Sequence, residues 1–244
     1  PSSRLYCNDL SSLKTGTLRL GASNFLCLNR SAIISSFSSL YPGISIDVQE
    51  APSLELKNRV VNEELDIIID PMDFEETLFS SHHLFNDYFL LTVPKKNPLN
   101  QELVSYALTQ EQILNNIHLR PEFPKAPLQL FSEELFLFMR PETVTVPEPQ
   151  KYVSIMALNL NPVLPGSADN LLPVRLAGLG SAFVTDSVIK SNPLKNSVLF
   201  YKLDPKLAKR TIAAVYKKNH YMSKASLEFI SMAENRLKIM DSIL

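Results

Sequence analysis

Hydroxyl and amide side chains stand where two predicted strands give way to helices, and these side chains could bind a small ligand. Ser23 and Asn24 follow the first predicted strand, 17–22, and Ser53 opens the second predicted helix, 53–62. Backbone N–H groups at a helix N-terminus favour negatively charged groups. The same side chains could equally act as N-caps, because serine and asparagine are preferred there. The two helix N-termini at the strand ends therefore predict a ligand site, with capping as the open alternative.

Motifs of catalysis and metal binding are absent from the sequence. It holds no Gly-x-Ser-x-Gly turn, no phosphate-binding glycine-rich loop and no His-Glu-x-x-His pair. None of the 4 histidines has a second ligand at the spacing of a zinc site. We therefore expect a binding protein that has no enzyme activity, metal or cofactor.

The composition is that of a globular protein. The 244 residues are 45% hydrophobic and 20% charged, which is ample for a packed core. A net charge of −1 carries no basic footprint of nucleic-acid binding, so this chain alone is not expected to bind DNA. Its apolar runs are far shorter than the roughly 20 residues that span a bilayer, so no membrane partner is expected. Cys7 and Cys27 are predicted to be free thiols in a reducing compartment, which favours the cytoplasm.

The elements that position the candidate residues alternate between strand and helix. A strand at 17–22, a helix at 29–40, a strand at 44–48 and a helix at 53–62 lead into the apolar run Ile67-Ile68-Ile69 before Asp70. This alternation predicts a parallel α/β sheet with a ligand crevice at the carboxyl ends of its strands.

The last third of the chain returns to the same style. Residues 177–184 are expected to form a helix end, a turn and a strand, and 208–216 another strand. A helix is expected from Ser223, its N-cap, to about 239. Its one buried face is predicted from apolar residues three and four apart, namely Leu227, Ile230, Ala233 and Leu237.

Prolines and glycines mark the borders of these regions. Most of the 17 prolines lie between 94 and 173, which predicts short strands, short helices and loops there. The composition shifts near residues 90 and 210, and we take these shifts as candidate domain borders. Each of the 6 glycines stands at a boundary of a predicted element, where a positive φ is useful.

A series of short motifs resembles the effector-binding domain of LysR-type transcriptional regulators. In order, they are Gly16-x-Leu18-Arg19-Leu20-Gly21, Phe37-x-x-x-Tyr41-Pro42-x-Ile44, Glu50-x-x-Ser53 with Glu64-Leu65-Asp66, Pro94-x-x-Asn97-Pro98-Leu99, Gly178-Leu179-Gly180 and Ser223-x-Ala225-x-x-x-Phe229. Asn97 stands where the family usually has histidine. The resemblance covers 16 to about 237, and the order and spacing of the motifs make it specific.

Finer features resemble the subgroup that contains the nodulation, naphthalene-degradation and LeuO-type regulators. They are Leu108-Thr109 followed by His118, Arg140 before Val144-x-Val146-Pro147, and the segment 169–177.

The resemblance implies an α/β fold of two Rossmann-like lobes joined by a two-strand hinge, like type 2 periplasmic binding proteins. Lobe one would comprise 16–86 and 209–244, and lobe two 87–208. A small effector would bind between them and favour the closed form by its differential affinity. Family members begin with a winged helix-turn-helix and a linker helix. We therefore expect an excised regulatory domain, with 1–15 as a remnant of the linker and DNA bound only through the missing N-terminal domain.

The resemblance also implies which residues meet the effector. Ser23, Asn24 and Ser53 hold positions where the family places hydroxyl or amide groups, and His118 matches a histidine that lines the crevice in the subgroup. A structural role for His118 is the alternative. Gly166, Ser167 and Asp169 are expected where lobe two faces the cleft. Arg120 and Arg175 could balance a carboxylate or form surface salt bridges. The expected effector is anionic or aromatic.

Two further expectations concern assembly and a competing function. Family members pair side by side, which predicts a homodimer or tetramer through helices at about 30–41 and 223–239. The apolar residues on these helices could instead all face their own core. The alternative function is a periplasmic solute-binding protein of a transport system, which has the same two-lobe fold.

Overall fold

The chain forms two compact units that are described separately below. The computed structural model describes residues 13, 15–22, 30–71, 74–131, 135–137, 161–163, 180–191 and 198–242. The first unit comprises 1–86 and 210–244, and the second comprises 87–209. The chain passes from the first to the second within β4 (Phe79–Pro94) and returns at the start of β10 (Lys209–Lys217).

A mixed sheet forms the centre of the first unit. β1 (Gly16–Ala22) pairs in parallel with β2 (Ile44–Glu50) on one side and with β3 (Ile67–Pro71) on the other. β10 pairs antiparallel with β3, and β4 follows next in the sheet. The predicted parallel pairing is therefore confirmed for β1, β2 and β3, whereas β10 makes the sheet mixed.

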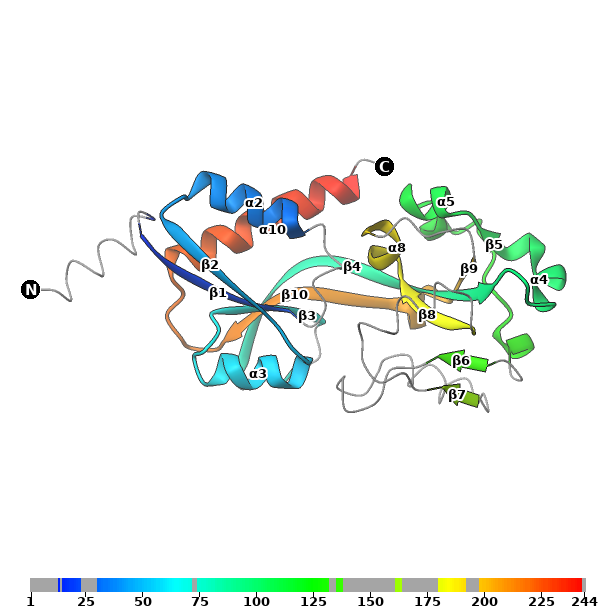
Figure 1. The fold of residues 1–244 in the computed structure, drawn as a ribbon, viewed down its shortest axis with the longest axis horizontal. Helices are drawn as coiled ribbons and strands as arrows, with labels where there is room; N and C mark the ends of the chain where they lie inside the picture. The colour runs from blue at the N-terminus through cyan, green and yellow to red at the C-terminus, as the bar shows by residue number, and fades with distance from the viewer. Residues whose placement is uncertain are drawn as a thin grey trace, which may run out of the picture. The chain divides into compact units, whose positions relative to one another are not determined.

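Helices cover both faces of this sheet, as Figure 1 shows. α2 (Arg30–Leu40) and α10 (Lys224–Ser242) lie on one face, and α3 (Ser53–Val61) lies on the other. In β3, Ile67 and Ile69 pack with α2 and α10, whereas Ile68 packs with α3. A strand that is buried on both faces reads as a continuous apolar run, and this explains Ile67-Ile68-Ile69.

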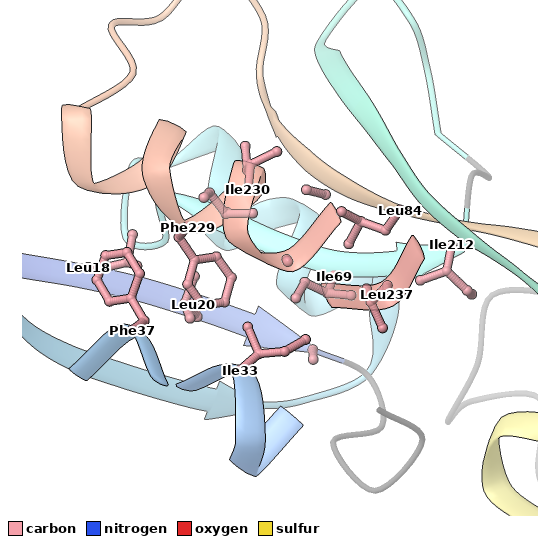
Figure 2. Close-up of a cluster of buried hydrophobic side chains, with 14 of the residues drawn as sticks. Leu18, Leu20, Ile33, Phe37, Ile69, Leu84, Ile212, Phe229, Ile230 and Leu237 are labelled. Atoms are coloured by element: carbon pink, nitrogen blue, oxygen red, sulfur yellow. The ribbon is translucent and has the colours of Figure 1, made fainter. Parts of the chain in front are cut away.

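The larger core of this unit lies between the sheet and the helix pair α2 and α10 (Figure 2). The rings of Phe37 and Phe229 join the two helices edge to face, with centroids 5.5 Å apart. Leu18 and Leu20 of β1 are almost completely buried beneath them. Burial of each such side chain stabilises the fold by about 1.5–3 kcal/mol, so this helix pair is firmly seated.

Two predicted details of the C-terminal region are corrected by the structure. Ala208 does not begin the strand, because it ends the short helix α9 (Pro205–Ala208), whose N-cap Asp204 accepts from the N–H of Lys206. Leu227 is 54% exposed rather than on the buried face of α10. At ~100° per residue it lies about 120° around the helix from the buried Ala233.

Ser223 is the N-cap of α10, as predicted. Its Oγ accepts from the N–H of Ser226 at 3.1 Å, which satisfies one of the free donors of the first turn.

Gly21 differs from the prediction that each glycine marks a boundary. It lies inside β1 and faces α3. A Cβ there would come within 2.7 Å of Leu65 and 2.9 Å of Ile68 and Leu56. Gly21 is therefore required for close packing of α3 on the sheet rather than for an unusual φ.

The second unit is built from short elements, as the prolines predicted for this region. Its described helices are α4 (Leu99–Glu102), α5 (Gln110–Leu114), α8 (Asp186–Ser191) and α9, with 3₁₀ turns at Val104–Tyr106, Ile117–Leu119 and Leu128–Phe131. Its strands besides β4 are β5 (Ala107–Leu108), β6 (Leu135–Leu137), β7 (Asn161–Val163), β8 (Ala182–Thr185) and β9 (Val198–Lys202). β4 pairs antiparallel with both β8 and β9.

Tyr201 anchors the core of the second unit. Its ring is fully buried, with its centroid 6.2 Å from that of Phe131. Its hydroxyl donates to the Asn100 side chain at 2.7 Å, and burial raises the pKa of Tyr201 to about 12. Asn97 accepts from the N–H of Leu99 at the start of α4. Asn97 thus has a local structural role.

Candidate functional site

Ser53 and Asp70 form a buried polar pair in the first unit. Ser53 is the first residue of α3, and Asp70 lies near the end of the buried strand β3. The Ser53 hydroxyl donates to the Asp70 carboxylate, and the two residues are only 6% and 1% exposed. The carboxylate is thus held beside the first turn of α3, where a negative charge is favourable.

The N-cap alternative for Ser53 is wrong. The N-cap of α3 is Pro52, with φ −56° and ψ 145°, and no side chain makes a capping hydrogen bond there. The Ser53 hydroxyl instead donates to Asp70. This partner lies 17 residues further along the chain, so the residues next to Ser53 in the sequence could not reveal it.

The packing of α3 fixes the position of this pair. Leu56 and Val60 bury the inner side of α3 against Ile68 of β3. Lys57 lies one turn after Ser53 and is the charged residue among those buried along this helix. Residues four apart share a helix side, so Ser53 and Lys57 lie on the same side of α3.

Charged side chains also fix the turn between α3 and β3. The Arg19 guanidinium donates to Asp66 at 2.7 Å and to the Glu63 carbonyl at 2.8 Å. The hydrogen bond with Asp66 raises the pKa of Arg19. The hydrogen bond from Lys217 lowers the pKa of Glu63, which has a left-handed φ of 64°. These contacts connect β1 and β10 to the turn between α3 and β3.

His118 lies in the second unit, in a buried cluster around Asp186. Its Nε2 is 3.3 Å from Oδ2 of Asp186, and the two side chains are 2% and 3% exposed. Neither ring nitrogen makes a well-aligned hydrogen bond within the described part of the chain, so His118 and Asp186 are close without a hydrogen bond of good geometry. These buried surroundings fit the structural role that was the alternative to effector contact for His118.

Lys190 brings a positive charge to the Asp186 carboxylate. Its Nζ is 2.8 Å from Oδ2 of Asp186 and also donates to Asn116. Burial raises the pKa of Asp186, but contacts with Asp87, His118 and Lys190 lower it by more. The net effect holds the pKa of Asp186 below its ordinary value of 3.8, so Asp186 carries a negative charge at neutral pH.

Asp87 and Asp186 also bind the backbone where β4 enters the second unit. Asp186 accepts from the N–H of Tyr88 at 3.0 Å, and Asp87 accepts from the N–H of Ser187 at 3.3 Å. These hydrogen bonds fasten the start of α8 to β4, close in sequence to the unit border after Asn86.

The other expected site residues lie outside the described residues. They are Ser23, Asn24, Gly166, Ser167 and Asp169. Arg175 lies outside as well, and the exposed Arg120 uses its backbone carbonyl to accept from Lys202 at 2.6 Å.

Asp70 and Asp186 were not among the predicted site residues. Each stands at or just after the end of a buried strand, and this position was a usable signal for both. Among the described residues, no three histidine, cysteine or acidic side chains gather as a metal site would require. The Ser53–Asp70 pair and the cluster around Asp186 can each accept hydrogen bonds through a carboxylate, as a ligand-binding site would.

The fold resembles solved effector-binding domains. The BenM effector-binding domain with benzoate matches with a TM-score of 0.71 at 16% identity, covering 93% of this chain and 94% of that one. The QuiR domain in complex with shikimate gives 0.69 at 15%, covering 92% and 98%. Full-length BenM gives 0.69 at 14%, covering 98% of this chain and 75% of that one.

Sequence comparisons give a family and no individual relative. No curated protein sequence matches this chain significantly. None of the helices in the described ranges is both long and apolar enough to span a membrane. The family model described as "LysR substrate binding domain" matches residues 11–238.

That match covers nearly the whole chain and agrees with the fold, which is of the periplasmic-binding-protein-like type 2 class. It confirms the predicted regulatory domain over a transport component, whereas the finer subgroup stays a prediction. The chain belongs to the LysR substrate-binding domain family, the ligand-sensing domains of LysR-type transcriptional regulators.

Proposed function

We propose that this domain binds a small anionic or aromatic effector between two lobes, with Ser53 as the best-supported contact. The supporting observation is the Ser53–Asp70 pair, a buried, hydrogen-bonded pair near the end of β3 and at the start of α3. The contact set expected from the family comprises Ser23, Asn24, Ser53, His118, Gly166, Ser167 and Asp169.

His118 enters this proposal with a specific condition. The residue is 2% exposed beside Asp186, so an effector reaches the ring only when the covering side chains move. We propose that such a movement accompanies effector binding in the second unit.

Effector binding is proposed to act through the two passages of the chain between the units, in β4 and β10. A ligand shifts a conformational equilibrium only by its differential affinity for the two forms. In a full regulator, the shift would be passed to an N-terminal winged helix-turn-helix. A cytoplasmic location and a binding role without catalysis fit this proposal.

We also propose that the domain forms a homodimer, or a tetramer in the full regulator, through α2 and α10. The support comes from Leu40 and Leu227, large apolar side chains that are 64% and 54% exposed on these helices.

Calorimetry on this domain with a validated effector tests the binding proposal. Ser53→Ala and His118→Ala should each weaken binding by about tenfold, since loss of one well-placed hydrogen bond changes affinity by ~1.4 kcal/mol. Ser231→Ala on the exposed side of α10 is the control and should bind as the wild type does. Unchanged affinity in both site variants would refute the assignment.

A further inference from the structure

Asp70 changes what the Ser53 position offers to a ligand. A free serine hydroxyl can donate one hydrogen bond and accept others. Here its donor is used on the Asp70 carboxylate, so Ser53 presents acceptor lone pairs only. The carboxylate itself is also an acceptor without donors when ionised.

The surroundings of the Ser53–Asp70 pair favour a negative charge on the Asp70 carboxylate. Asp70 is 1% exposed and lies beside the first turn of α3, whose N-terminus favours a negative group. Lys57, 9% exposed, supplies a positive charge one turn further along the same helix side. Asp70 thus stands where an anionic ligand would otherwise benefit from the N-terminus of α3.

We propose that Asp70 is the specificity-determining residue of the first unit, and this inference rests on the proposed effector site at Ser53. The pair selects a ligand group that donates hydrogen bonds or carries positive charge, and it disfavours a carboxylate at this position. Of the two effector classes, the inference favours a neutral or cationic aromatic molecule over an anionic one.

Three aromatic probes of nearly equal shape separate these classes, namely benzoate, benzamide and benzamidine. We expect the wild-type domain to bind benzamide and benzamidine at least about tenfold more tightly than benzoate, since like charges within a few ångströms repel. In Asp70→Asn, the preference for benzamide over benzoate should fall by at least about tenfold, because the start of α3 then lacks the negative charge of Asp70.

The exposed Asp47 provides a matched control, and Asp47→Asn should keep the wild-type preference. Asp70→Ser is the second neutral variant if Asp70→Asn does not fold. Binding is measured by calorimetry on the 244-residue chain at millimolar probe concentrations.

The outcomes separate this inference from the proposed site itself. Benzamide binding that weakens in Ser53→Ala, with an unchanged benzoate-to-benzamide ratio in both Asp70 variants, overturns the inference and leaves the site intact. A wild-type domain that prefers benzoate overturns it as well. Probe binding that does not change on substitution of Ser53 or Asp70 overturns both the inference and the proposed site. A wild-type domain that binds none of the three probes does so as well.

Discussion

Single carboxylates organise the polar interior of each unit. Asp70 receives the Ser53 hydroxyl at the start of α3, and Asp186 is itself the first residue of α8 beside Lys190. A buried charge is costly unless it is paired and hydrogen-bonded, so each carboxylate depends on its partners. Removing one partner from such a cluster should therefore cost more than removing an exposed ion pair.

Asp186 gives a prediction about pH. Its folded pKa is depressed, so its contribution to stability is fully present above the unfolded value near 3.8 and is lost as the pH falls through and below it. Asp186→Asn should lower the free energy of unfolding at neutral pH by about 3 kcal/mol, because Lys190, His118 and the N–H of Tyr88 lose a buried, charged partner. Urea titrations at pH 7 and at about pH 2.5, which is well below the unfolded pKa, measure both effects.

The acid loss of stability should be smaller in Asp186→Asn than in the wild type. Asp47→Asn, at an exposed position, is the control and should change the neutral-pH stability little. Equal wild-type and Asp186→Asn stabilities at neutral pH would contradict the role given to Asp186.

Gly21 gives a prediction about packing. Gly21→Ala places a methyl group against Leu65, Ile68 and Leu56, all of which are almost fully buried. Overpacking of this kind costs about 1–3 kcal/mol, so the urea midpoint should fall. The control is Gly43→Ala, because Gly43 is an exposed turn residue. A Gly21→Ala domain as stable as the wild type would show that α3 can move away without cost.

The bounds of helices and strands were more predictable from the sequence than the contacts that individual side chains make. Hydrophobic periodicity and the Tyr41-Pro42-Gly43 stop placed α2, β2 and α3 within a residue or two, because these signals are local. The exposure of Leu227 was not predictable in this way, since Phe229, Ile230 and Ala233 define the buried stripe only once α2 is in place. The partners of Ser53 and His118 lie 17 and 68 residues away, and no local pattern encodes such contacts.

The N-cap of α10 gives a prediction at the scale of the element. Ser223→Ala removes the acceptor for the N–H of Ser226, and loss of such a cap costs about 1 kcal/mol. Thermal unfolding should show a lower midpoint. Ser231→Ala, at an exposed position inside the same helix, is the control and should be neutral or slightly stabilising, since alanine favours helix. A larger loss from the control would contradict the capping role.

At the scale of the whole molecule, the proposed regulation requires coupling between the two units. Each unit has its own core, and the chain crosses between the units only within β4 and at the start of β10. Asp87 and Asp186 secure the backbone of Tyr88 and Ser187 next to the first crossing. A regulator built this way can report an effector through a change between units while each unit keeps its internal packing.

Assembly provides the last prediction. Phe37 and Phe229 pack α2 against α10, and the Tyr41 hydroxyl donates to Glu228 at 3.5 Å. Leu40 and Leu227, which are next to Tyr41 and Glu228 in the sequence, are nevertheless exposed.

A two-fold dimer uses the same patch on both subunits, so one substitution disrupts the contact twice. We expect sedimentation at micromolar concentration to show a dimer for the wild type and a monomer for Leu40→Glu and Leu227→Glu. Val104→Glu, at a 72% exposed position in the second unit, should remain dimeric. A wild-type monomer throughout this range, or dimers in all variants, would mean that α2 and α10 serve only their own core.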